Sequence, residues 1–252
     1  MVLISGQVAR PAVGTDAFQE APVFNLMSSA AKHVFMVNDE KDLEVTVRAA
    51  FYIARSGRPG PVVIDVPKDV QNHRSVFKGE GLLPMHWYEK RTEANKASRM
   101  SKDEVKEFFA LLKASRRPLL YVGGGVILAE AAKELRAFVD EFKIPVVTTL
   151  TGLGAMDTTH ELCLNMLGMH GAAYANYAVE DCDLLIAIGA RFDDRVAGVP
   201  KLFAPHAKIV HFDIDAAEIG KVKQVDWHHV GDAKVVLRDL LLHGKGIALK
   251  HE

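Results

Sequence analysis

Leu119-Leu120-Tyr121-Val122-Gly123-Gly124-Gly125 decides the fold, because a short apolar run ends directly in three glycines. Such runs are typical of strands buried on both faces of a parallel sheet. Three more strands are expected downstream, at 145–148, 184–188 and 209–214. Helical patterns alternate with them, near 129–142, 172–180 and 233–242. Residues 101–252 are therefore predicted to form a doubly wound parallel sheet, a Rossmann-like α/β domain that opens with a capping box of Ser101 and Glu104 on a helix to about residue 114.

A smaller α/β unit is expected to precede this domain, in residues 1–70. Its predicted strands are 2–5 and 62–66, and its predicted helices are 21–32 and 41–55. Gly57 stands where a left-handed residue would end the second helix, and a Pro-Gly turn leads into the second strand. Residues 71–100 have little periodicity and are predicted to be a linker.

Composition excludes several classes of protein. The 252 residues carry 31 basic and 32 acidic side chains, interspersed along the chain, which disfavours a nucleic acid partner. No apolar run approaches the roughly 20 residues that span a bilayer, so no membrane segment is expected. The two cysteines, Cys163 and Cys182, lack CxxC spacing and favour a reducing, cytoplasmic compartment. Because the chain opens directly on strand-like residues, we expect its natural beginning to lie upstream.

Candidate ligand-binding residues follow the predicted strands, because ligands of doubly wound sheets lie beyond the carboxyl ends of the strands. Gly123, Gly124 and Gly125 are candidates for holding a phosphate at a helix start, although a plain tight turn explains them equally well. Leu128 replaces the last glycine of a GxGxxG fingerprint. Thr149 and Leu150 follow the next strand without the acidic residue that binds an NAD ribose, which disfavours a nicotinamide cofactor.

Charged residues follow the two later strands. The segment Gly189-Ala190-Arg191-Phe192-Asp193-Asp194-Arg195 offers guanidinium groups to phosphate oxygens, or forms a solvated loop with internal ion pairs. Asp213 and Asp232 are candidates for binding ribose hydroxyls, and for Asp215 and Asp232 helix capping is an equal alternative. Neither histidine nor carboxylate spacing indicates a metal site.

Four stretches of residues 1–70 form a more specific pattern: Ser5-Gly6-Gln7-Val8, Gly14-Thr15-Asp16-Ala17-Phe18-Gln19-Glu20, Ser56-Gly57-Arg58-Pro59-Gly60-Pro61-Val62 and Val66-Pro67-Lys68-Asp69-Val70. Later stretches extend it: the glycine triplet, Gly168-Met169-His170, the segment from Gly189 to Arg195, and His211-Phe212-Asp213-Ile214-Asp215. With these stretches the chain resembles the acetolactate synthase (acetohydroxyacid synthase) large subunits, a thiamine diphosphate-dependent family. Only the tail beyond about residue 242 carries no resemblance.

The resemblance implies a domain for each region and a set of cofactors. Residues 1–70 would be the later part of the domain that binds the thiamine pyrimidine, 71–100 a linker, and 101–252 the central FAD-binding domain. The glutamate that activates thiamine would lie upstream of Met1, and the diphosphate and Mg²⁺ site, with its GDG motif, beyond Glu252. The family's FAD does no net redox work.

The resemblance also implies a role for particular residues. Gln19, beside Phe18, would reach the thiamine site, and Lys68, Met169 and Arg195 would line the substrate entrance, with Arg195 binding the carboxylate of the acceptor. The residues that match the family's FAD site are Arg58, Gly123, Gly124, Gly125, Thr149, Leu150, His170, Gly189, Arg191, Asp193, Asp213 and Asp232. Ala9 departs from the family pattern, in which many members carry proline.

The implied reaction is decarboxylation of pyruvate and transfer of its two-carbon unit to a second 2-keto acid, pyruvate or 2-ketobutyrate, in branched-chain amino-acid synthesis. The implied assembly is a homodimer or tetramer of catalytic subunits, with a possible small regulatory subunit. Two alternatives stay open: a glyoxylate carboligase or pyruvate oxidase type of enzyme, and a noncatalytic FAD-binding or association module. The chain by itself is predicted to be inactive.

Overall fold

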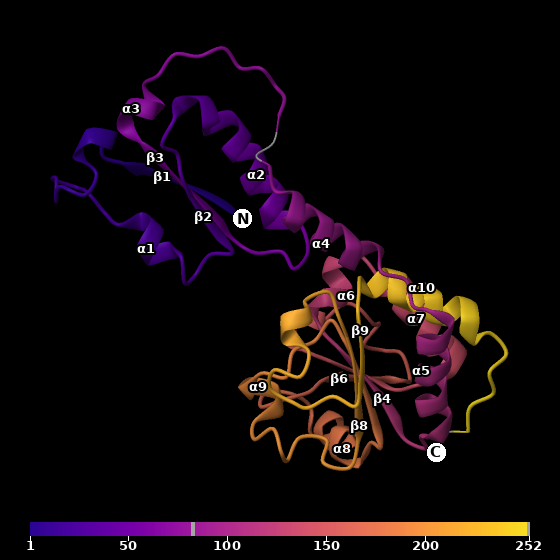
Figure 1. Cartoon of the computed structure of the whole chain (residues 1–252). Coiled ribbons are helices and arrows are strands. Elements are labelled where there is room, and N and C mark those ends of the chain that lie inside the picture. The colour runs from indigo at the N-terminus through magenta and orange to yellow at the C-terminus, as the bar shows by residue number, and fades with distance from the viewer. Residues whose placement is uncertain (82–83, 251–252) are drawn as a thin grey trace. The chain divides into compact units, whose positions relative to one another are not determined.

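The computed structural model describes residues 1–81 and 84–250, and the chain divides into two compact units, Met1–Thr92 and Glu93–Glu252. Each unit has its own parallel sheet, covered by helices (Figure 1). We refer to them as unit 1 and unit 2.

Unit 1 is built on three parallel strands in the order β1-β3-β2. They are β1 (Val2–Gln7), β2 (His33–Met36) and β3 (Val62–Pro67). All six residues of the central strand β3 are buried, Asp65 among them, as its otherwise apolar sequence predicts. Helix α2 (Leu43–Arg55) packs Ala50 and Ile53 onto β3. The remaining helices are α1 (Val23–Met27), α3 (Lys68–Gln71) and the first part of α4 (His86–Ala97), which runs past the boundary at Thr92. The 3-10 turns are η1 (Arg10–Ala12) and η2 (Glu40–Asp42).

One expectation for unit 1 needs correction, and the predicted linker contains a helix that the sequence pattern did not reveal. The helix expected at 21–32 is wrong in extent, because only Val23–Met27 are α-helical and β2 begins at His33. The four residues of β2 are too few to show a strand period in the sequence. The segment 71–100, expected as a linker, contains α4, whose only buried residue is Thr92. Apart from Trp87 and Tyr88 its residues are polar or small, so the sequence shows no apolar period there.

Unit 2 holds a six-stranded, all-parallel sheet in the order β6-β5-β4-β7-β8-β9. The strands are β4 (Pro118–Val122), β5 (Val146–Thr148), β6 (Cys163–Met166), β7 (Leu184–Ile188), β8 (Lys208–Asp213) and β9 (Trp227–Val230). The strands predicted at 119–122, 145–148, 184–188 and 209–214 correspond to β4, β5, β7 and β8, whereas the sequence pattern does not reveal the edge strands β6 and β9. Strand order reverses between β4 and β7, which is where doubly wound sheets place a crevice.

Helices cover both faces of this sheet. They are α5 (Lys102–Ala114), α6 (Gly124–Leu128), α7 (Ala132–Phe142), α8 (Ala173–Asp181), α9 (Asp194–Ala197) and α10 (Ala233–Gly244), with 3-10 turns η3 (Leu150–Gly152) and η4 (Ala216–Glu218). The predicted capping box is present at α5: the Glu104 amide donates to Ser101 Oγ at 3.2 Å, and the Ser101 amide donates to Glu104 Oε2 at 2.7 Å. The helix expected at 129–142 starts three residues later, because Glu130 adopts a left-handed φ of 52° between α6 and α7.

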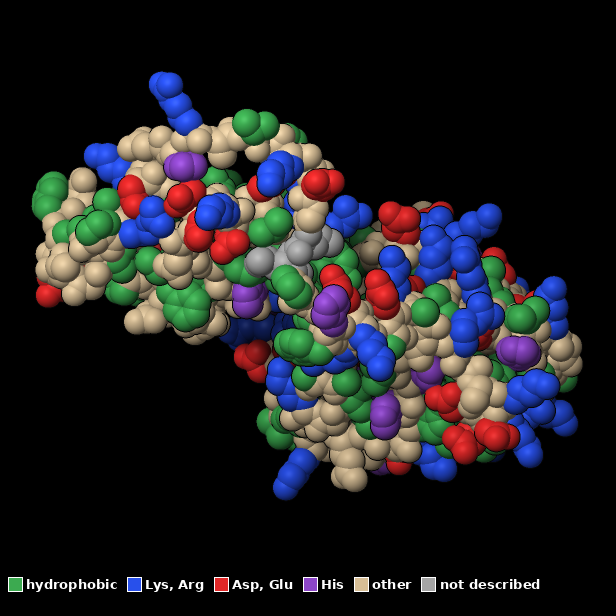
Figure 2. Space-filling view, turned by 45° about the horizontal axis from the view of Figure 1, so that its top comes forward, with side chains coloured by type: hydrophobic (Ala, Val, Ile, Leu, Met, Phe, Trp, Pro, Cys, Tyr) green, Lys and Arg blue, Asp and Glu red, His purple; other side chains and the backbone are tan. Residues whose placement is uncertain are grey.

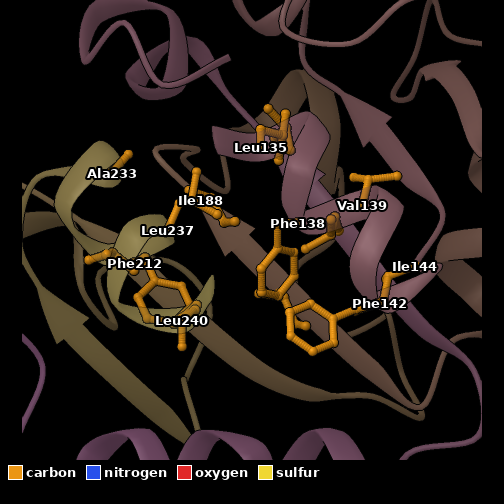
Figure 3. Packing of buried hydrophobic residues seen from close by; sticks show 14 of the residues in the cluster. Leu135, Phe138, Val139, Phe142, Ile144, Ile188, Phe212, Ala233, Leu237 and Leu240 are labelled. Carbon is orange, nitrogen blue, oxygen red and sulfur yellow. The ribbon is translucent and has the colours of Figure 1, made fainter. Parts of the chain in front are cut away.

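Side chains of β4 alternate between two hydrophobic clusters, one on each face. Leu120 and Val122 join Phe108, Phe138 and Phe212 in one cluster. Figure 3 shows Phe138 of α7, Phe212 of β8 and Leu237 of α10 within this cluster. Leu119 and Tyr121 join the opposite cluster, beneath α8. Two buried faces hold the strands of unit 2 in one register, because a slip by one residue would exchange the clusters.

Surface charges are mixed. In Figure 2, Lys and Arg side chains lie among Asp and Glu over the visible face of each unit. Within residues 1–81 and 84–250, no helix combines the length and the apolar character that crossing a membrane requires.

Candidate functional site

The carboxyl ends of the unit 2 strands are joined by a continuous row of backbone hydrogen bonds. The Thr149 amide, after β5, donates to Val122 O of β4 at 2.9 Å. The Gly123 amide, after β4, donates to Ile188 O of β7 at 3.0 Å. The Gly189 amide donates to Phe212 O at 2.8 Å, and the Gly231 amide to Asp213 O at 2.9 Å. The predicted residues after β4, β5, β7 and β8 therefore lie side by side at one edge of the sheet.

Glycines at the switch between β4 and β7 allow the two backbones to touch. A Cβ on Gly123 would lie 2.2 Å from Gly189 O, and a Cβ on Gly125 would lie 2.6 Å from Gly189 Cα. Gly189 also has a left-handed φ of 55°. No side chain fits between the two loops. The three positions are glycine because of close packing, whatever they bind.

This packing limits how the triplet could hold a phosphate. The Gly123 amide bonds Ile188 O, and the Gly125 amide bonds Gly189 O at 2.9 Å. Among the described residues, Gly124 is the one member of the triplet whose amide makes no such bond. It is half-buried, beside Thr151. The sequence left phosphate binding and a tight turn open for the triplet, and the geometry leaves the Gly124 amide for a phosphate.

The segment after β7 is held by buried side chains that bind its backbone, while its arginine side chains are exposed to solvent. Tyr121, fully buried, donates its hydroxyl to Arg191 O, and burial raises the pKa of Tyr121. His211 Nε2 lies 3.0 Å from Ala190 O. The Arg191 side chain is 52% exposed, and its Nη2 lies 3.8 Å from Asp193 Oδ2. One guanidinium face thus stays accessible to a ligand.

Asp193 opens α9 and accepts the Arg195 amide at 3.0 Å. The side chain of Arg195 is 71% exposed, and its Nη1 lies 3.9 Å from Asp194 Oδ2. The segment after β6 meets it here: the Met169 amide donates to Arg195 O at 2.9 Å. Met169 and Arg195, distant in sequence, therefore lie together, with His170 exposed beside them.

The acidic candidates differ in burial and in the hydrogen bonds that their carboxylates already accept. Asp213 is nearly buried, and its Oδ1 accepts the Asp215 amide at 2.8 Å. Asp215 caps η4 through the Ala217 amide. Asp232 caps α10, with Oδ1 2.9 Å from the Lys234 amide. The capping alternative is thus realised at Asp215 and Asp232, and both amides that Asp232 accepts bind its Oδ1.

After β5, Thr149 caps η3 and accepts the Gly152 amide at 3.1 Å. Leu150 projects from this turn with 71% of its surface exposed. An apolar side chain held at the crevice edge can cover a flat aromatic ligand but cannot bind a ribose.

In unit 1, the predicted residues Phe18 and Gln19 lie on a loop that joins β1 to α1. Glu20 closes this loop, since its carboxylate accepts the Gly14 amide and, at 3.2 Å, the Ala17 amide. The Gly14 contact is the main reason why the pKa of Glu20 lies below its usual value. Gln19 has a left-handed φ of 67°, and Phe18 is 89% exposed. The loop displays both side chains to solvent.

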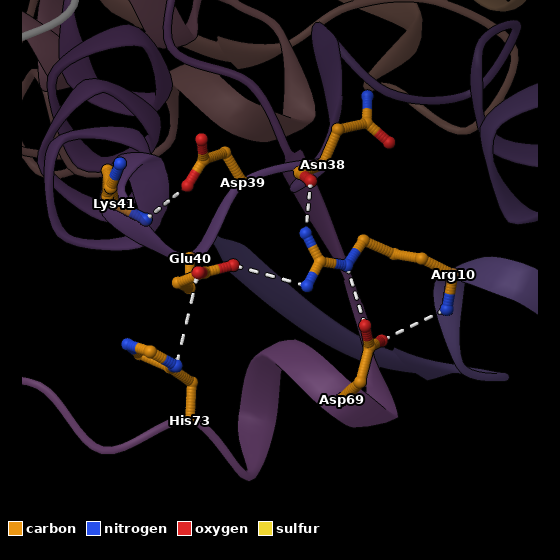
Figure 4. A network of polar contacts seen from close by, with 7 residues as sticks. All are labelled: Arg10, Asn38, Asp39, Glu40, Lys41, Asp69 and His73. Carbon is orange, nitrogen blue, oxygen red and sulfur yellow. Dashed lines mark hydrogen bonds and ion pairs between the residues drawn. The ribbon is translucent and has the colours of Figure 1, made fainter.

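Lys68 begins α3 at the carboxyl end of β3 and is exposed, and Arg58 is exposed in the turn before β3. Sequence analysis did not identify Arg10. This residue joins the loop after β1 to the start of α3, where Lys68 lies, because it binds Asp69, Asn38 and Glu40 (Figure 4). The available signal was an arginine three residues after one strand and an aspartate two residues after its parallel neighbour.

Among the residues that the structure describes, no group of three His, Cys, Asp or Glu could hold an ion. Both cysteines are buried free thiols.

Comparisons with known proteins give matches to one family of enzymes. The family described as "Thiamine pyrophosphate enzyme, central domain" matches residues 105–240. An acetolactate synthase large subunit of Parasynechococcus marenigrum is 49% identical over 236 residues, 92% of this chain and 37% of that protein. One of Corynebacterium glutamicum is 49% identical over 96% of this chain and 38% of that protein. The chloroplastic acetolactate synthase 2 of Nicotiana tabacum is 48% identical over 95% of this chain and 35% of that protein. The chain therefore spans less than half the length of these relatives.

Proposed function

Since the chain belongs to the thiamine pyrophosphate enzyme family and carries that family's central domain, we propose that it is part of an acetolactate synthase large subunit. The reaction is decarboxylation of pyruvate and transfer of the two-carbon unit to a second 2-keto acid in valine, leucine and isoleucine synthesis. The observation that carries the proposal is the near 50% identity to such subunits across both units.

We assign residues 1–70 to the pyrimidine-binding domain, 71–100 to a linker and 101–252 to an FAD-binding central domain. The six-stranded sheet supports the last assignment, because its strand order places a dinucleotide crevice at the β4–β7 switch.

The residues at the β4–β7 switch are of the chemical types that could bind the parts of an FAD. Arg191 offers an accessible guanidinium to the pyrophosphate, and Gly124 offers an amide. Asp213 and Asp232 offer carboxylate oxygens to hydroxyl groups, and Leu150 offers an exposed apolar side chain. His170, Gly189, Asp193 and Thr149 complete the proposed set in unit 2, and Arg58 of unit 1 is proposed separately as an FAD contact.

On the substrate side, thiamine diphosphate, when bound, supplies the nucleophilic carbon and the electron sink. Phe18 and Gln19 are proposed to contact it. Lys68 of unit 1 is a proposed substrate contact, and so are Met169 and Arg195 of unit 2. The Arg195 guanidinium is proposed to bind the acceptor carboxylate by paired, charge-assisted hydrogen bonds, which a neutral aldehyde could not make. That preference would select 2-keto acids.

We further propose a homodimer or tetramer of catalytic subunits, with Mg²⁺ bound outside this chain and a small regulatory subunit as an additional partner. The cytoplasmic compartment and the choice between pyruvate and 2-ketobutyrate stay predictions.

Flavin binding tests the central-domain proposal. The 252-residue chain is titrated with FAD, and quenching of flavin fluorescence is followed. We expect saturable binding that Arg191→Met weakens. The control is Arg238→Met, which removes an exposed arginine that pairs with Glu134 instead. Absence of saturable binding by the folded chain would contradict this assignment.

Acetolactate formation tests the enzyme proposal. The chain is assayed with pyruvate, thiamine diphosphate, Mg²⁺ and FAD, alone and extended with the flanking regions of the Corynebacterium glutamicum relative. We expect product only from the extended protein. Product from the chain alone, or an extended, folded protein that makes none, would overturn the proposal.

A further inference from the structure

Arg10 makes an unusual number of polar contacts for a half-exposed side chain. Its amide donates to Asp69 Oδ1 at 3.0 Å and its Nε donates to Asp69 Oδ2 at 2.6 Å. Its Nη1 donates to Asn38 O at 2.8 Å, and its Nη2 lies 3.2 Å from Glu40 Oε2. All three guanidinium nitrogens are engaged (Figure 4). A lysine, with one nitrogen, could not reproduce this fork.

The contacts join three segments that leave the same edge of the unit 1 sheet. Arg10 follows β1, Asn38 and Glu40 follow β2, and Asp69 follows β3. The strands are parallel, so these segments begin together at their carboxyl ends. Arg10 also holds the pKa of Asp69 below its usual range, through its amide first and its side chain second. The Asp69 carboxylate therefore stays ionised and paired.

A second group of hydrogen bonds, made by Gln7, holds the end of the loop that joins β1 to α1. Gln7 Nε2 donates to Ala21 O at 2.7 Å and to Asp65 Oδ2 at 3.0 Å, and Gln7 Oε1 accepts the Val8 amide at 2.9 Å. Asp65 is only 1% exposed. One buried side-chain pair thus holds both ends of the segment 8–21, and Arg10 fastens its start to Asp69.

We propose that Arg10 is a positioning residue that fixes the loop bearing Phe18 and Gln19 relative to Lys68. Asp69 directly follows Lys68, so the contact that holds Asp69 also sets the start of α3. The inference rests on the proposed function, which gives Gln19 and Lys68 their roles. Arg10 itself need not touch substrate or cofactor.

Hydrogen–deuterium exchange on the 252-residue chain tests the geometry without any assay of activity. Arg10→Lys keeps the charge and loses the fork, so amides of residues 11–20 and 69–73 should exchange several-fold faster, while β3 stays protected. The matched control is Arg48→Lys, whose arginine pairs with Glu44 one turn away on the same helix. It should leave both segments unchanged. Exchange in Arg10→Lys that matches wild type would overturn the proposal.

A kinetic arm separates positioning from simple structural support. In the extended enzyme, Arg10→Lys should lower kcat several-fold at an unchanged melting temperature, and Arg48→Lys should not. An active enzyme whose kcat and KM are indifferent to Arg10→Lys would overturn the proposal, even if exchange rises. If the extended enzyme makes no acetolactate, the proposed function fails, and the exchange result alone decides whether Arg10 fixes the loop.

Discussion

The two units present their strand ends in different ways. In unit 1, the loop after β1 is held by side chains: Arg10 on Asp69, Glu20 on two amides and Gln7 on a buried carboxyl. In unit 2, the loops after β4 and β7 are held by backbone contact, with glycines where no side chain fits. Exposed ion pairs are weak and screened by salt, whereas packed backbone is not. Substitutions at the strand ends should therefore act locally in unit 1 and globally in unit 2.

The largest effect should come from a methyl group between the unit 2 loops. Gly125→Ala places a Cβ 2.6 Å from Gly189 Cα, and neither backbone can yield without breaking the row of hydrogen bonds. We expect a loss of about 3 kcal/mol in the free energy of unfolding. It is measured by urea denaturation, with the fluorescence of Trp227 in a Trp87→Phe background as the signal.

A control separates collision from backbone strain. Gly154 has a left-handed φ of 91°, and a methyl group added there would meet open space, so Gly154→Ala carries strain alone. We expect about 1 kcal/mol there. Equal losses at Gly125 and Gly154 would contradict the steric account of the glycine switch.

A smaller effect is expected beneath the same loop. Tyr121→Phe removes the hydroxyl that binds Arg191 O and leaves that carbonyl without its buried donor. The expected loss is about 1.5 kcal/mol, with weaker FAD binding because Arg191 is less fixed. Tyr177→Phe, at an exposed position on α8, is the control and should change neither quantity. Wild-type stability in Tyr121→Phe would show that backbone contact alone holds the loop.

The sequence predicted the strand ends of unit 2 well for a physical reason. Strands β4 and β7 are buried on both faces, so their continuous apolar runs are visible without a structure. The edge strands β6 and β9 are only partly buried, and their polar residues hide them. Which loops meet is set by strand order, and a local pattern does not encode that order.

The same limit applies at the site. The three consecutive glycines were compatible with phosphate binding or with a tight turn, and two of their amides join neighbouring loops. Arg10 went unnoticed because its partners are 28 to 59 residues away in the chain. The sequence identified which residues gather at the strand ends. Their hydrogen-bond partners depend on tertiary contacts that only the fold supplies.

A change of pH should affect the stability of the two units with opposite sign, through different carboxyls. Asp183 in unit 2 accepts the Ser115 hydroxyl and the amides of Arg116 and Arg117, and these bonds outweigh burial and lower its pKa. Its stabilising contribution is therefore present above the pKa of the unfolded state and lost as pH falls through the folded value. Asp183→Asn should cost about 1 kcal/mol at pH 7 and flatten the loss of stability below about pH 4.

Asp65 in unit 1 should make stability depend on pH in the opposite direction. Burial raises its pKa, so its contribution is present below the unfolded pKa and is lost as pH rises through the folded value. Asp65→Asn keeps an oxygen for Gln7 and should raise stability at pH 7. Urea unfolding of both variants across pH 3 to 7 checks the pair, and parallel pH profiles would contradict the two assignments.

The smallest effect tests whether the unit 1 loop can be held by its backbone instead of its charges. Ala9 has a φ of −57° and a ψ of 144°, a conformation that proline also adopts, and its amide makes no backbone bond within the described residues. Ala9→Pro should therefore raise stability by about 0.5 kcal/mol, because it restricts the unfolded chain. It should also partly restore slow exchange of residues 11–20 in the Arg10→Lys variant. Ala12→Pro is the control, because the Ala12 amide donates to Ala9 O and proline would remove that bond. If Ala9→Pro destabilises the chain as much as Ala12→Pro does, the loop depends on a freedom at residue 9 that its backbone angles do not reveal.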